Sequence, residues 1–75
     1  MKITNLDLDE KVESINRYAG YGEPIIAVHW SHEGYQIHEC RTGYAICPHG
    51  AMEEIYRQLV AMRYGMSAMG MGMRR

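Results

Sequence analysis

The chain has 75 residues, of which 47% are hydrophobic and 23% charged, so it has room for one hydrophobic core and is too apolar to be disordered throughout. Eight lysine and arginine residues are balanced by nine acidic residues, which leaves no excess of cations for binding a nucleic-acid backbone. We therefore expect one small domain without direct nucleic-acid binding.

The apolar runs of the chain are short. Runs such as Ile25 to Val28 are far too short to span a bilayer, and the first thirty residues contain no apolar stretch typical of a signal peptide. We expect a cytoplasmic protein with no membrane contact, in which Cys40 and Cys47 are reduced thiols.

The N-terminal part predicts a helix over residues 8–19. Asp7 and Glu10 have the spacing of an acidic cap with a Glu three residues later, and apolar residues then recur on one helical face. Gly20 and Gly22 are expected to end the helix.

Three β-rich runs follow Pro24 and predict a three-stranded antiparallel β-meander. Glu33-Gly34 and Thr42-Gly43 separate the runs and have the composition of two-residue hairpin turns. These turns set two registers, with His32 paired to Tyr35 and Arg41 paired to Tyr44.

Alternation along the strands divides the side chains between two faces. The first face is large and apolar, with Ile26, Val28, Trp30, Tyr35, Ile37, Tyr44 and Ile46. The second face is small and polar, with Ile25, Ala27, His29, Ser31, Gln36, His38, Cys40, Ala45, Cys47 and His49. We expect the apolar face to pack against the helices. Glu39 and Arg41 also fall on it, which requires either a place at the sheet edge or a second register shifted by one.

A second helix is predicted from about Ala51, with apolar residues at spacings of three and four, and Gly65 is expected to end it. The fold class is therefore α+β in the order helix, three strands, helix (αβββα), with both helices on one face of the sheet. Residues 1–65 form a single domain, and residues 66–75 are expected to form a flexible tail rich in Met and Gly.

The polar face and one loop hold the candidate binding residues. These are His29, Ser31, Gln36, His38, Cys47 and His49, together with Tyr21 as an exposed aromatic anchor. In the predicted register His29, His38 and Cys47 are cross-strand neighbours and are candidate ligands of a transition metal. The simplest interpretation of these polar residues is a solvated sheet face without a ligand. A polar ligand or a protein contact is the further alternative.

Catalysis has little support in these residues. Cys47 beside His38 would pair a nucleophile with a base, but no third group orients the base, and a flat sheet face offers no oxyanion hole. We expect a protein that is not an enzyme and that needs no cofactor.

Three segments carry a resemblance to a known group. They are Gly34-Tyr-Gln-Ile-His38, Gly43-Tyr-Ala-Ile-Cys-Pro-His49 and Glu54-Ile-Tyr-Arg-Gln-Leu59. Together, over about residues 34–65, they resemble small uncharacterised tailed-phage accessory proteins, from which this chain departs by a tighter second turn and by a His49 that precedes a glycine. The resemblance implies an anti-defence protein in the host cell cytoplasm, and it supplies no functional residues.

Three functions follow as hypotheses. The first is an anti-CRISPR-like inhibitor that binds a host defence protein or complex through the polar face and Tyr21. The second is an oligomeric small-ligand binder, either a nucleotide-signal sponge or a His/Cys metal-binding module, that uses His29, His38, Cys47 and His49. The third is a structural or regulatory phage component.

Overall fold

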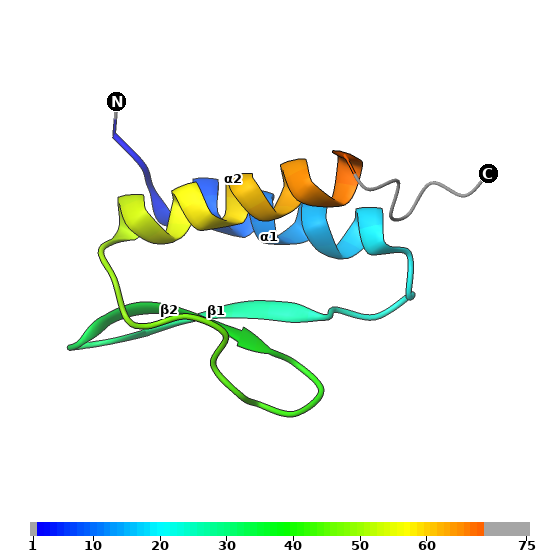
Figure 1. Ribbon diagram of the computed structural model, residues 1–75. Helices are drawn as coiled ribbons and strands as arrows, with labels where there is room; N and C mark the ends of the chain where they lie inside the picture. The colour runs from blue at the N-terminus through cyan, green and yellow to red at the C-terminus, as the bar shows by residue number, and fades with distance from the viewer. Residues whose placement is uncertain (1, 69–75) are drawn as a thin grey trace.

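Two helices and a β-hairpin make up the part of the chain described by the computed structural model, residues 2–68. Their order is α1 (Asn5–Ala19), β1 (Ile26–Ser31), β2 (Gly34–Glu39) and α2 (Met52–Ala68). Both helices lie on the same face of the hairpin (Figure 1). The α+β class and this placement of the helices are confirmed, whereas the prediction of a third strand is wrong.

Helix α1 begins earlier than predicted because Thr4, and not Asp7, is the N-cap. The Asp7 N–H donates to Thr4 Oγ1 at 3.3 Å, and the Thr4 N–H donates to Asp7 Oδ2 at 2.9 Å, which is a reciprocal capping box. At the other end Gly20 adopts a φ of 76°, and its N–H donates to Asn16 O at 3.4 Å. Gly20 therefore ends the helix as predicted.

The hairpin turn consists of His32 and Glu33, one residue earlier than predicted. Tyr35 consequently lies opposite Trp30 and not opposite His32. The Ser31 hydroxyl accepts the N–H of Glu33 at 3.2 Å and stabilises the turn. Because the register differs by two residues, the side chains of β1 and β2 keep the faces that the sequence predicts.

Residues 40–51 form a loop along the outer edge of β2 in place of the third strand. The loop touches β2 at two isolated bridges, His38 to Ala45 and Tyr35 to Gly50. Five residue steps separate Ala45 from Gly50, whereas three separate Tyr35 from His38. The loop must therefore bulge, and Pro48 within the bulge has no N–H to donate to a ladder.

The turn before this bulge is also wider than predicted. The Glu39 N–H donates to Tyr44 O at 2.8 Å, and the Gly43 N–H donates to Glu39 O at 2.8 Å, so the connection contains Cys40 and Arg41 in addition to Thr42 and Gly43. Arg41 is exposed in this loop. Arg41 thus lies beyond the end of β2, which removes the conflict of a charged residue on the core side of the sheet.

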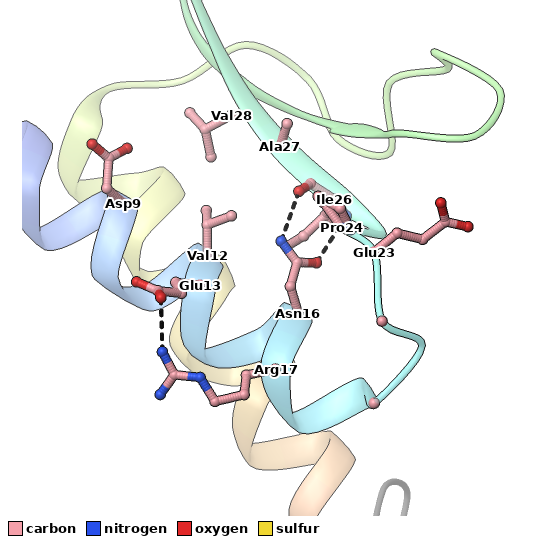
Figure 2. A pocket seen from close by; sticks show the side chains of 12 residues that line it. Asp9, Val12, Glu13, Asn16, Arg17, Glu23, Pro24, Ile26, Ala27 and Val28 are labelled. Atoms are coloured by element: carbon pink, nitrogen blue, oxygen red, sulfur yellow. Dashed lines mark hydrogen bonds and ion pairs between the residues drawn. The ribbon is translucent and has the colours of Figure 1, made fainter.

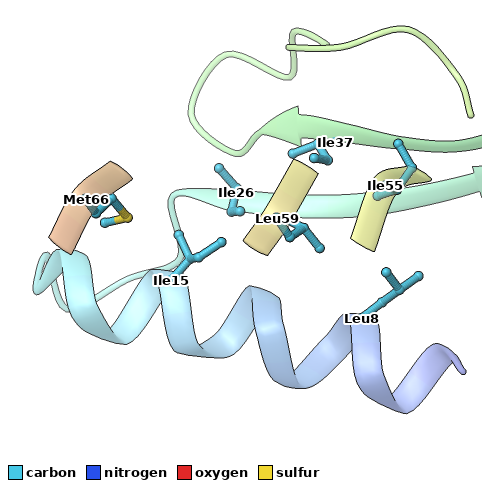
Figure 3. Close-up of a cluster of buried hydrophobic side chains, with 7 residues drawn as sticks. All are labelled: Leu8, Ile15, Ile26, Ile37, Ile55, Leu59 and Met66. Atoms are coloured by element: carbon cyan, nitrogen blue, oxygen red, sulfur yellow. The ribbon is translucent and has the colours of Figure 1, made fainter. Parts of the chain in front are cut away.

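The core lies between the hairpin and the two helices (Figure 3). Its buried side chains are Leu8, Ile15, Ile26, Ile37, Ile55, Leu59 and Met66. Trp30, Tyr44 and Ile46 were expected there but are 68%, 73% and 46% exposed. Tyr44 and Ile46 are exposed because the third strand does not form, and Trp30 lies at the tip end of the hairpin.

Helix α2 starts where predicted and runs further. Glu54 Oε1 accepts the N–H of Ala51 at 2.9 Å at the N-terminal end. Gly65 was expected to end the helix, but α2 continues to Ala68, and the burial of Met66 stabilises this last turn. Residues 66–68 of the expected tail are thus helical, and residues 69–75 lie outside the described part.

One side chain joins α1 to the beginning of β1. Asn16 Oδ1 accepts the N–H groups of Ile25 and Ile26 at 2.8 and 3.1 Å, and Asn16 Nδ2 donates to Ile26 O at 3.2 Å. Figure 2 shows this contact from α1 to the strand. The Asn16 amide therefore acts as a short substitute for a neighbouring strand.

Substitution of Gly34 by alanine tests the close approach between β2 and the loop. Gly34 has a φ of 122°, and a Cβ there would lie 2.8 Å from Gly50 O. We expect Gly34→Ala to lower the free energy of unfolding by about 2–3 kcal/mol in urea denaturation. Gly65→Ala is the matched control, because it lies inside α2 with open space around it and should raise stability by up to ~1 kcal/mol. Equal effects of the two variants would contradict the loop position.

Removal of the Asn16 amide tests the junction of α1 and β1. Asn16→Ala leaves the partly buried N–H groups of Ile25 and Ile26 without their acceptor and should cost about 1–3 kcal/mol of unfolding free energy. The control is Arg17→Ala on the same helix, which removes only an exposed ion pair with Glu13 and should cost at most ~1 kcal/mol. If Arg17→Ala lowers the free energy of unfolding as much as Asn16→Ala does, the Asn16 amide does not specifically stabilise the junction of α1 and β1.

Candidate binding surface

Two histidines form the centre of the sheet face that the helices leave uncovered. The rings of His29 and His38 stack with centroids 4.3 Å apart and an interplanar angle of 22°. His29 lies opposite Gln36, and His38 lies opposite Ala27, so the two rings meet diagonally. The predicted direct pairing is wrong, but the predicted proximity of the two histidines is confirmed.

Gln36 connects His38 to the backbone of the loop. Its side-chain Nε2 donates to Cys47 O at 2.8 Å, and its Oε1 lies 2.8 Å from His38 Nε2. Because the amide nitrogen is used as the donor, Oε1 acts as the acceptor and His38 Nε2 carries a proton. Nδ1 is then the only ring nitrogen of His38 that can act as an acceptor. We call His29, Gln36 and His38 the histidine network.

Cys47 does not join the histidine network. Its thiol accepts the N–H of Ile37 with N and Sγ 3.5 Å apart, and its side chain packs against the core. The cause is the loop bulge, which places Ala45 and not Cys47 opposite His38. The predicted row of His29, His38 and Cys47 is therefore wrong, and with it the neighbouring nucleophile and base.

The arrangement of these side chains does not provide the ligands of a metal centre. Within residues 2–68, no group of three or more His, Cys, Asp or Glu side chains is placed to hold a metal ion.

Ser31 and His49 lie at the hairpin tip. The Ser31 hydroxyl is engaged by the turn, and His49 Nδ1 lies 3.5 Å from Glu33 Oε1, so that a protonated His49 would form an ion pair. Ser31 is two residues after His29 in β1, so the two side chains lie on the same face of the strand. The tip therefore extends the polar face beyond the histidine network.

Tyr21 lies at the other end of the hairpin, in the loop between α1 and β1. It is 70% exposed and borders a depression with Ile25, Glu39 and Arg41. The predicted site residues thus follow the length of the hairpin and do not converge on one pocket.

A groove between α1 and β1 is the main surface feature that the sequence did not predict. It has a volume of about 820 Å³, and Val12, Asn16 and Val28 are among the residues that line it (Figure 2). The uncharged composition of β1 was a usable signal for an open strand edge. No local signal shows that Asn16 turns toward that strand.

Comparison of this chain with protein-family models, with curated proteins and with solved structures found no match. Neither helix within residues 2–68 is long and apolar enough to cross a membrane.

Substitutions at two adjacent positions of β2 test the assignment of the faces. His38 is on the uncovered face, so His38→Ala should change the free energy of unfolding by less than about 1 kcal/mol. Ile37 is fully buried on the other face, and Ile37→Ala should cost about 2–4 kcal/mol. Thermal and urea unfolding of both variants provide the measurement. The reverse order of effects would show that the two faces are inverted.

Proposed function

We propose that this chain is a non-enzymatic, phage-type anti-defence protein that binds a protein component of a host defence complex. The more specific form of this proposal is an anti-CRISPR-like inhibitor of a host effector complex in the host cytoplasm. The observation that carries it is the histidine network on the uncovered face of the hairpin.

The histidine network is suited to protein recognition because its groups are held in place before a partner arrives. His29 stacks on His38, and Gln36 is held by Cys47 O at 2.8 Å. Side chains that are already ordered lose less conformational entropy on binding than free ones. The network can offer donors and acceptors to a polar surface in a fixed arrangement.

Exposed aromatic side chains accompany the histidine network. Trp30 on β1, Tyr44 in the loop beside β2 and Tyr21 before β1 are each more than two-thirds exposed. Tyr and Trp bury large areas with few rotatable bonds and are enriched at protein interfaces. Tyr21 would supply an apolar part of a contact whose polar part is the network, whereas Trp30 alternates with His29 and lies on the opposite face of β1.

The choice of a host defence complex as partner depends on the resemblance of residues 34–65 to small tailed-phage accessory proteins. The segment of that resemblance from Gly34 to His38 includes the close approach at Gly34 and two members of the histidine network, Gln36 and His38.

Affinity capture with a matched control tests this function. The immobilised chain is incubated at micromolar concentration with a lysate in which a CRISPR effector complex is active, and retained proteins are quantified by mass spectrometry. Because the network supplies the polar contact, His29→Ala combined with His38→Ala should lower retention of the effector at least tenfold. Glu53→Ala, an exposed position on α2, should leave retention unchanged.

An interference assay in cells completes the test. The wild-type chain should restore survival of a targeted plasmid, and the double histidine variant should not. Retention of no specific host protein, or equal retention by the double variant, would contradict the proposal. Native mass spectrometry that shows bound nucleotide or zinc, without a retained protein, would support the small-ligand alternative instead.

A further inference from the structure

Strand β1 has a free edge on the side away from β2. The Cys40 N–H donates to Ile25 O at 2.9 Å, so the paired residues that continue this ladder are Ala27 with His38 and His29 with Gln36. In an antiparallel pair the intervening residues direct their N–H and C=O groups to the other side. The backbone groups of Ile26, Val28 and Trp30 therefore point away from β2.

Only the first of these three residues has its outward groups satisfied. Asn16 binds both the N–H and the C=O of Ile26. Within residues 2–68, no hydrogen bond reaches the outward N–H or C=O of Val28 or Trp30. The open edge runs from the Asn16 contact to the turn at the hairpin tip, over residues 27–31.

The open edge lacks the features by which proteins usually protect a strand from pairing. β1 contains no charged residue and no proline. The first residues of the open edge, Ala27 and Val28, line the groove of about 820 Å³ on the side of α1, and the edge continues past the groove toward the hairpin tip. An additional strand placed along this edge would direct alternate side chains into the groove.

The groove has an acidic lining. Asp9, Glu13 and Glu23 border it, against a single Arg17 whose guanidinium is engaged by Glu13 at 2.7 Å. Among residues 2–68, no cation forms an ion pair with Asp9 or Glu23. The C-terminal end of α1 at Gly20 also borders the groove, and the partial negative charge of a helix C-terminus favours a cation there.

The geometry points to strand addition: β1 binds an extended basic segment of the partner protein as a further β-strand, with its Lys or Arg side chains directed into the acidic groove. This inference depends on the proposed function for the nature of the partner, and it names the chemistry of the segment bound. Backbone pairing at Val28 and Trp30 supplies the attachment, and the charges of Asp9 and Glu23 select a basic segment.

A synthetic peptide tests the site without the natural partner. The probe is an eight-residue peptide with blocked ends and alternating Lys and Thr, and its control has Glu at every Lys position. Hydrogen exchange followed by NMR reports each amide separately. We expect the Lys peptide to slow exchange of the Val28 and Trp30 amides at least tenfold. The Ala27 and His29 amides already pair with β2 and should change little, so they are an internal control.

Two variants separate backbone pairing from charge. Val28→Pro removes an outward N–H without removing a bond to β2, and should weaken binding of the Lys peptide at least tenfold in calorimetry. Asp9→Lys combined with Glu23→Lys keeps the strand edge and should reverse the preference toward the Glu peptide. If Val28→Pro disturbs the fold, the exchange pattern of the unmodified chain still decides the question.

Each remaining outcome overturns the inference. Binding of the Lys peptide without protection of Val28 and Trp30 would show attraction by charge alone, and no binding at millimolar peptide would exclude the site. Protection that appears on concentrating the chain without peptide would show that a second copy occupies the edge. Failure here with successful capture of the effector refutes strand addition only, whereas peptide binding without effector capture refutes the proposed function.

Discussion

The contact between the Asn16 amide and the start of β1 is the interaction on which the arrangement of this small domain depends. β1 has a neighbouring strand on one side only, so the outward backbone groups of Ile26 need another partner. Asn16 provides it from the last turn of α1 and thereby fixes the distance and angle between helix and strand. The position of Ile26 in the core, the groove beside β1 and the limit of the open edge all follow from this contact.

The bulge in the loop after β2 is the second constraint, because it determines the chemistry of the uncovered face. Two additional residues between the bridges at Ala45 and Gly50 turn the Cys47 thiol toward the N–H of Ile37. The same turn places Cys47 O where the Gln36 amide can donate to it. The loop therefore places the Cys47 thiol away from the uncovered face. It also orders the His38 ring, because Cys47 O holds the Gln36 amide that contacts His38.

β1 serves two surfaces at once because side chains and backbone groups alternate along it. His29 faces away from the helices and belongs to the histidine network, whereas the backbone groups of Val28 and Trp30 belong to the open edge. A partner that docks on one surface therefore lies next to the other. In a chain of 75 residues, such shared use of one strand offers a larger contact than either surface alone.

Local patterns in the sequence determined the helices, the first two strands and the two faces of the hairpin, because periodicity and capping residues act within a few positions. They placed His29 near His38 correctly, since an error of two residues in register preserves the face. They could not show that a loop takes the place of the predicted third strand, and they could not show where Cys47 lies. Both depend on contacts between distant residues, above all the bridges from the loop to β2 at Ala45 and Gly50 and the close approach of Gly34 to Gly50. Only the tertiary structure decided them, because a turn length or an amide contact is selected by packing across the whole domain.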